Sequence, residues 1–211
     1  MSPKIFLTSS VNFVAKDIAK KLGNVKNKKI LYIYTACEQK RGSQWQIDNR
    51  DSLVKVGFKV IDYTITGKSV ATIKKDFKNT DAVYVEGGST LYLLQQIQLT
   101  KSAPIFKQAV KDGKIYIGTS AGSMVAGANV YPSYIPGKIK TAPKLKGCKG
   151  LGLVDFCILP HWGSEEYKEQ YFGEKLTHNY NTKNKLVILN DYQYIQTNDD
   201  WYRINEVKHK A

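Results

Sequence analysis

One short segment has the residue types and spacing of a nucleophile turn. It reads Gly118-Thr119-Ser120-Ala121-Gly122 and follows an apolar run at residues 115–117. In a Gly-x-Ser-x-Gly pattern the serine lies on a sharp strand-to-helix turn, which exposes its hydroxyl at the carboxyl end of a sheet. The backbone N–H of Ala121 then faces the oxygen that becomes negative during acyl transfer. We predict that Ser120 is a nucleophile; an N-capping serine is the alternative, and Ser123, inside the following helix, is the weaker candidate.

A second glycine turn follows another short apolar strand. Residues 82–85 lead into Glu86-Gly87-Gly88-Ser89-Thr90 and then an apolar helix. A Gly-Gly turn at the carboxyl end of a strand frees backbone N–H groups to face a ligand. Such strand ends share one crevice in open α/β sheets. We therefore expect the N–H of Gly88 to be a second oxyanion donor, with a turn that only caps the helix as the alternative.

A general base must reach the hydroxyl of Ser120, and the chain has three histidines. His209 lies in a charged tail, and His178 lies at a polar helix end, where we expect it on the surface. His161 follows the apolar residues 156–159 and Pro160, at the end of a predicted strand, and Trp162 could shield it from water. We predict that His161 is the base; a structural histidine is the alternative.

The third member of such a site is a carboxylate that orients the imidazole. Asp191 follows the apolar run 186–189 at another strand end. Asp155 and Glu165 are closer to His161 in sequence, but one begins the same strand and the other begins the next helix. We predict Asp191, with an Asn-Asp turn as the alternative.

The segments that position these residues alternate between short strand-like runs and stretches with the periodicity of an α-helix. Strands are predicted at residues 4–8, 29–34, 58–63, 82–85 and 115–118, and helices at 11–22, 43–56, 70–77, 90–97 and 103–111. This alternation is typical of a parallel sheet covered by helices.

The rest of the chain has a less regular pattern. Residues 131–150 contain three prolines and several lysines and predict a long loop or short hairpin. Beyond them we expect a strand at 153–159, a helix at 164–179, and closing strands at 186–189, 192–197 and 201–207, with a turn at 198–200. No linker divides the sequence, so we expect a single domain over residues 1–211.

Composition narrows the class of protein. The 211 residues are 42% hydrophobic, and no segment has the ~18 consecutive apolar residues of a membrane-spanning helix. No signal peptide is evident, so we expect a cytoplasmic protein. Cys37, Cys148 and Cys157 have no paired spacing and predict neither a zinc site nor a disulfide framework.

The formal charge of +14 has three interpretations. It could mark nucleic-acid binding, keep the protein soluble, or attract anionic substrates. The lysines are spread along the chain without an arginine-rich tract, which favours solubility over nucleic-acid binding.

Together the motifs resemble the peptidase E (aspartyl dipeptidase) family of serine peptidases, which is related to the cyanophycinases. The resemblance covers most of the chain and rests on residues 34–36, 87–90, 118–122 and 159–161. It implies an α/β three-layer sandwich with a mostly parallel sheet, similar to flavodoxin and to class I glutamine amidotransferases.

The resemblance also implies an activity. The expected reaction is hydrolysis of short peptides, with dipeptides that carry an N-terminal acidic residue as candidate substrates. No metal or cofactor is implied, and we expect a monomer or homodimer. Ser89, Thr90 and Thr119 are the expected substrate contacts. The family's acid-recognising arginine has no evident counterpart after His161, and Lys168 or Lys175 is the candidate replacement.

Two other functions remain open from the sequence. One is hydrolysis of a different amide substrate; glutamine amidotransferases of this architecture use Cys at the nucleophile turn, so Ser120 favours hydrolysis. The other is a non-catalytic binding or regulatory protein on the same fold.

Overall fold

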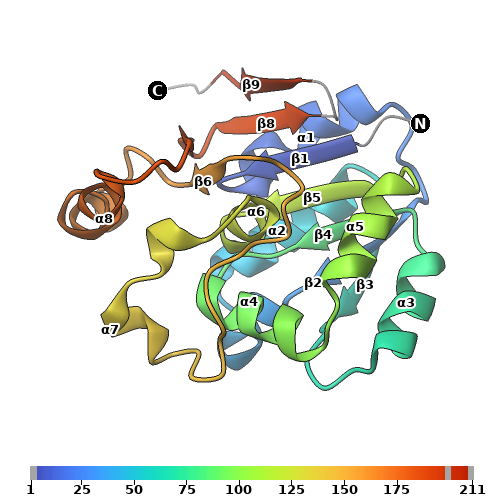
Figure 1. The fold of residues 1–211 in the computed structure, drawn as a ribbon. Helices are drawn as coiled ribbons and strands as arrows, with labels where there is room; N and C mark the ends of the chain where they lie inside the picture. The colour runs from blue at the N-terminus through green and yellow to red at the C-terminus, as the bar shows by residue number, and fades with distance from the viewer. Residues whose placement is uncertain (1–3, 198–200, 209–211) are drawn as a thin grey trace.

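A seven-stranded sheet forms the centre of the computed structural model, which describes residues 4–197 and 201–208. The predicted turn at 198–200 and His209 lie outside these residues. The strand order is β3-β2-β4-β5-β1-β8-β9 (Figure 1). The bounds are β1 Lys4–Thr8, β2 Lys29–Ile33, β3 Lys59–Tyr63, β4 Ala82–Val85, β5 Ile115–Thr119, β8 Gln193–Thr197 and β9 Tyr202–Glu206. The first five strands are parallel, and β8 and β9 extend the sheet antiparallel beyond β1.

Helices cover both faces of this sheet (Figure 1). Apolar residues of α1 (Val11–Leu22) and α2 (Gln44–Lys55) belong to one core cluster. Those of α3 (Val70–Lys78), α4 (Thr90–Leu99), α5 (Ala103–Lys111) and α6 (Ala121–Ala126) belong to the other. The predicted three-layer α/β fold is therefore confirmed.

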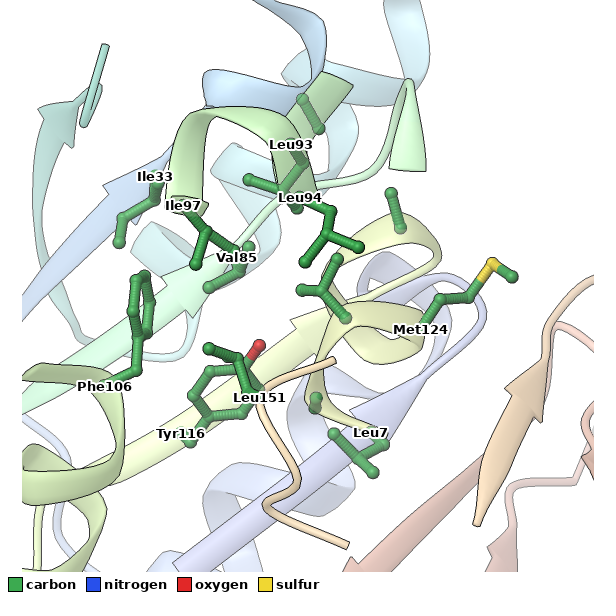
Figure 2. Packing of buried hydrophobic residues seen from close by; sticks show 14 of the residues in the cluster. Leu7, Ile33, Val85, Leu93, Leu94, Ile97, Phe106, Tyr116, Met124 and Leu151 are labelled. Atoms are coloured by element: carbon green, nitrogen blue, oxygen red, sulfur yellow. The ribbon is translucent and has the colours of Figure 1, made fainter. Parts of the chain in front are cut away.

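The larger core cluster lies beneath α4 and α5. Figure 2 shows Ile33 and Val85 of the sheet facing Leu94 and Ile97 of α4, with Phe106 of α5 beside them. All five side chains are at most 2% exposed, and burying each contributes about 1.5–3 kcal/mol. This packing fixes α4, and with it the glycine turn that precedes α4.

Part of the C-terminal half differs from the sequence expectation. Only β6 (Cys157–Leu159) of the predicted strand 153–159 forms. The N–H groups of Leu151 and Leu153 instead bond to the carbonyls of Val125 and Ala126, so this stretch is held against α6 rather than in a sheet. β6 pairs in parallel with β7 (Leu186–Ile188) in a separate two-stranded sheet, so β7 is not a strand of the main sheet.

The predicted helix over 164–179 forms as one continuous helical stretch over 165–179, but its hydrogen-bond pattern changes along its length. It begins with a 3₁₀ turn at Glu165–Tyr167, becomes π-helical at Gln170–Lys175 and ends as α8 at Leu176–Asn179. Gly173 lies in the middle of this stretch, where it weakens regular helix. The long segment 131–150 has a 3₁₀ turn at Tyr131–Ser133 and the short helix α7 at Pro136–Ile139. A further 3₁₀ segment, Thr35–Lys40, was not predicted.

Across residues 4–197 and 201–208, none of the helices has both the length and the apolar character to cross a bilayer.

Candidate active site

Ser120 occupies the turn between β5 and α6. Its backbone has φ 47° and ψ −109°, a strained conformation for a non-glycine residue. The turn is this tight because α6 packs directly on β4: a Cβ on Gly122 would lie 2.0 Å from the carbonyl oxygen of Val85. A Cβ on Gly118 would lie 2.7 Å from the backbone nitrogen of Ser123. The two glycines of the motif are therefore required by the turn that presents Ser120.

Ser123, the weaker candidate, lies in a different environment. Its hydroxyl is fully buried, donates to the carbonyl of Thr8 at 2.7 Å and accepts from the N–H of Thr8 at 2.9 Å. These bonds tie α6 to β1. The side chain of Ser123 is thus committed to the core, whereas Ser120 lines an open cleft.

His161 and Asp191 meet Ser120 in one hydrogen-bonded chain. The imidazole Nε2 lies 3.0 Å from Oγ of Ser120, and Nδ1 lies 2.6 Å from Oδ1 of Asp191. His161 follows β6 and Asp191 follows β7, so the small second sheet brings both to the carboxyl end of β5. A serine, an imidazole and a carboxylate in this order can activate a hydroxyl for attack on a carbonyl.

Ser9 holds the segments that carry His161 and Asp191 in place, and the sequence analysis did not identify this residue. Its buried hydroxyl donates to the carbonyl of Leu189 at 3.0 Å and accepts from the N–H of His161 at 3.1 Å. Ser9 follows β1, so it connects the main sheet to both segments that supply the imidazole and the carboxylate. His161 has φ 70°, a left-handed conformation that this bond helps to hold.

The other candidates for base and carboxylate lie elsewhere. Asp155 is exposed and pairs with Lys185 at 2.6 Å, and Glu165 is exposed and pairs with Lys168 at 3.3 Å. His178 stacks on Tyr131 with ring centroids 4.3 Å apart and is half-buried rather than on the surface as expected.

Tyr167, not Trp162, covers the imidazole. Its ring stacks on His161 with centroids 4.7 Å apart and planes 14° apart. Trp162 is 41% exposed, packs against Tyr171 and Phe172, and does not line the cleft. The expectation that Trp162 shields the histidine is therefore wrong; Tyr167 comes from the 3₁₀ turn that sequence periodicity did not reveal.

Two backbone N–H groups near Ser120 have no acceptor within the described residues. They belong to Gly88 and Ala121. Gly88 has φ 127°, and a Cβ there would lie 2.4 Å from the carbonyl oxygen of Ala36, so only glycine fits. Gly88 lines the cleft, and Ala121 directly follows Ser120, which also lines it. Such N–H groups can stabilise a developing oxyanion.

The three predicted substrate contacts have different surroundings. Ser89 and Thr90 line the cleft, but the hydroxyl of Ser89 accepts from the N–H of Tyr92 and so also caps α4. The hydroxyl of Thr90 points to the sulfur of Met124 at 3.5 Å. Thr119 also lines the cleft, but it is 2% exposed and its hydroxyl is bonded to that of Thr8 at 2.9 Å.

The cleft around Ser120 has a volume of about 520 Å³. Trp45 and Asn49 of α2 line it, as do Lys138 of α7 and Lys175 of the π-helical turn. A volume of this size accommodates a small organic ligand.

Lys175 is a buried cation in the wall of this cleft. It is 5% exposed, lies 5.2 Å and 5.9 Å from the ring centroids of Tyr171 and Tyr167, and forms no ion pair with a described carboxylate. Burial and, to a smaller extent, the nearby charge of Lys138 lower the pKa of Lys175 to about 8, against the raising effect of Glu174. Of the two lysines considered from the sequence, Lys175 faces the cleft and Lys168 does not.

Glu86, which precedes the second glycine turn, is fully buried and was also missed. Its carboxylate accepts hydrogen bonds from Gly87 N–H, Asn49 and the hydroxyls of Tyr32 and Tyr84. Burial raises the pKa of Glu86 to about 7, against the lowering effect of these hydrogen bonds.

Glu86 should make the free energy of unfolding depend on pH. Its pKa is higher in the fold than the ordinary 4.5, so its stabilising contribution is full below pH 4.5 and is lost as pH rises through 7. Urea unfolding of the wild type and Glu86→Gln, at pH 5 and pH 8, checks this. The difference between the two proteins should shift by roughly 2–3 kcal/mol in favour of the variant at pH 8. A difference that is the same at both pH values would contradict a raised pKa for Glu86.

The sequence is similar to known peptidases. The sequence profile of peptidase family S51 matches residues 5–205. A protein of Pasteurella multocida described as an uncharacterized peptidase is 31% identical over 198 residues, covering 93% of this chain and 94% of its own length. A peptidase E of a Nostoc species is 38% identical over 85 residues, which are 40% of this chain and 34% of that protein.

Solved structures agree with the sequence relatives. A crystal structure from Listeria monocytogenes EGD-e, described as a candidate peptidase E protein, matches with a TM-score of 0.87 and 25% identity, covering 99% of this chain and 100% of that one. A peptidase from an acI-B1 actinobacterium shares the fold, with a TM-score of 0.71 at 16% identity, 98% coverage of this chain and 88% of its own. With the profile match over nearly the whole length, these similarities show that the chain belongs to peptidase family S51 and is a serine-type peptidase.

Proposed function

We propose that the protein hydrolyses short peptides by a Ser-His-Asp mechanism. The hydroxyl of Ser120 attacks the scissile carbonyl carbon while Nε2 of His161 takes its proton. The resulting oxyanion accepts hydrogen bonds from the N–H groups of Gly88 and Ala121. His161 then protonates the leaving amine, the C–N bond breaks, and an acyl-Ser120 ester remains. Water, deprotonated by His161, hydrolyses this ester and restores the serine.

The observation that carries this proposal is the chain of bonds from Ser120 through His161 to Asp191, at 3.0 Å and 2.6 Å. Asp191 accepts a hydrogen bond from the Nδ1–H of His161, which leaves Nε2 as the acceptor that faces Ser120. The partial positive charge at the start of α6 adds to the stabilisation of the oxyanion.

The substrate class is inferred from one charge in the wall of the cleft, the ammonium of Lys175; Lys138, Glu166 and Asp191 also line the cleft. We infer that the ammonium of Lys175 binds the side-chain carboxylate of an N-terminal acidic residue. A buried cation without a carboxylate partner is costly, and an anionic ligand would provide that partner. π-helical turns are frequent at functional sites, and this one places Lys175 in the wall of the cleft.

Hydrolysis of a dipeptide panel tests this substrate class. Peptides with Asp, Glu, Asn, Leu or Ala at the N-terminus and Ala as the second residue are compared with wild type, Lys175→Met and, as a matched control, Lys168→Met. We expect Asp to be preferred, and Lys175→Met to lower kcat/KM for the Asp substrate about 100-fold while changing the Asn substrate little. Lys168→Met should behave as wild type. Equal losses for Asp and Asn substrates in Lys175→Met would contradict the assignment, and turnover of a neutral substrate alone would favour a different amide substrate.

The charge of Lys175 also predicts a pH dependence. Its pKa of about 8 means that the cation is present below pH 8 and is lost above it. The KM for the Asp substrate should therefore rise about tenfold per pH unit above 8. Lys175→Arg keeps its charge over this pH range, so its KM should not show the rise that comes from deprotonation of Lys175. Ionisation of the substrate's own amine affects the KM of both enzymes alike. Parallel KM profiles for the two enzymes between pH 6.5 and 9.5 would rule out titration of Lys175.

A further inference from the structure

Glu86 has a carboxylate that the hydrolytic mechanism does not use, although it lies one residue before the glycine turn of the site. It is fully buried at the carboxyl end of β4. Oε1 accepts from the N–H of Gly87 at 2.6 Å, from Nδ2 of Asn49 at 3.0 Å and from the hydroxyl of Tyr84 at 3.1 Å. Oε2 accepts from the hydroxyl of Tyr32.

These partners form a set that suits an ionised carboxylate. The N–H of Gly87 can only donate, and the amide of Asn49 is oriented because its Oδ1 accepts the N–H of Asn12 at 3.3 Å. Two carboxylate oxygens offer about four acceptor positions, which matches the four donors. Glu86 therefore connects the glycine turn to α2 through Asn49.

No ion pair among the described residues includes Glu86. Titratable groups close enough to feel its charge include Tyr32 on β2, Tyr84 on β4 and Cys37 in the 3₁₀ segment Thr35–Lys40. Burial raises the pKa of each, so all three are neutral near pH 8. An unpaired carboxylate in this position costs stability, so a purely structural need would be met more cheaply by an apolar side chain.

The hydrogen bonds of the glycine turn indicate what Glu86 does. The N–H of Gly87 is held by Glu86, and the N–H of Ser89 is held by the carbonyl of Ala36 at 2.8 Å. Between them, the N–H of Gly88 has no acceptor within the described residues. Because both neighbouring peptide groups are fixed, the direction of the Gly88 N–H is fixed as well.

We propose that Glu86 is a positioning residue, which holds the glycine turn so that the N–H of Gly88 points at the substrate's acyl oxygen. This proposal rests on the Ser120 mechanism described above. It predicts an effect in the transition state and little effect on substrate binding, since the oxyanion forms only during reaction.

The test compares Glu86→Gln with wild type at pH 8. Glutamine keeps the shape but replaces one acceptor oxygen by an NH₂ group, which faces donors. Rates are expressed per active site titrated with a serine-reactive phosphonate. We expect kcat to fall about tenfold or more with KM unchanged, and the affinity for a peptide boronic acid, which forms a tetrahedral adduct with Ser120, to fall by the same factor.

Glu38→Gln is the matched control. Like Glu86, Glu38 accepts several hydrogen bonds; its donors are the hydroxyls of Thr64, Thr66 and Tyr92, and it makes no bond to the glycine turn. This variant should keep the wild-type kcat and boronic acid affinity. The proposal would be overturned if Glu86→Gln had the wild-type kcat per titrated site and the wild-type boronic acid affinity. The same holds if the only change were a smaller fraction of protein that the phosphonate titrates. Absence of turnover and of Ser120 labelling in the wild type would instead refute the proposed function.

A measurement on the wild type covers the case in which Glu86→Gln does not fold. In ¹⁵N-labelled protein, the amide proton of Gly87 should move as Glu86 titrates near neutral pH, and the amide proton of Gly88 should move with it. A Gly88 signal that stays constant while Gly87 titrates would show that Glu86 does not control the Gly88 N–H, and would overturn the proposal.

Discussion

Ser120→Ala should lower kcat for the preferred dipeptide about 10⁶-fold, because it removes the atom that forms the acyl-enzyme. The variant should still fold, since Ser120 lies in the cleft and its side chain makes no bond that holds α6. Its affinity for the substrate should change little, because the cleft wall that contains Lys175 is intact. The rate is measured by following release of the free amine, with binding measured by calorimetry.

Ser123→Ala is the comparison that separates the two serines of the turn. Ser123 bonds only to the backbone of β1, so this change should lower stability and leave most of the turnover per folded molecule. Turnover that persists in Ser120→Ala and disappears in Ser123→Ala would show that Ser123, and not Ser120, is the nucleophile.

Asp191→Asn should lower kcat about 10⁴-fold with little change in KM. An asparagine can present an N–H to Nδ1 of His161, which favours the tautomer with the proton on Nε2. That tautomer cannot accept the proton of Ser120 across the 3.0 Å contact. The loss should be measured by steady-state kinetics from pH 6 to pH 9.

Asp155→Asn is the control for this second substitution. Asp155 is exposed and pairs with Lys185, and it is an acidic residue close to His161 in sequence. Its replacement should leave kcat unchanged. A fall in kcat of similar size in both variants, or a small fall in Asp191→Asn, would argue against Asp191 as the group that orients His161.

The parallel half of the fold could be predicted because local pattern and tertiary structure agree there. The first five strands are short runs rich in apolar residues, and α1, α3 and α5 each have one apolar face. The predicted bounds of these strands and of the helices between them differ from the observed ones by at most about two residues. Parallel strands end at one edge of the sheet, so residues just after a strand were natural site candidates. The same argument pointed to residues 120, 161 and 191.

The rest could not be predicted because it depends on contacts that leave no periodic signal. Tyr167 and Lys175 lie in 3₁₀ and π-helical turns, where the spacing of side chains differs from that of an α-helix. Ser9 and Glu86 are polar residues after strands, and only the three-dimensional structure shows that both are buried and fully bonded. Sequence pattern finds residues at strand ends but not the polar groups that orient them.

Covalent labelling is the most direct test of Ser120 as the nucleophile. The wild type, Ser120→Ala and His161→Ala are treated with a serine-reactive phosphonate, and the modified residue is located by peptide mapping with mass spectrometry. We predict one phosphonyl group per chain on Ser120 in the wild type, none in Ser120→Ala, and much slower labelling in His161→Ala. Labelling at another residue, or equal rates in the wild type and His161→Ala, would contradict the mechanism.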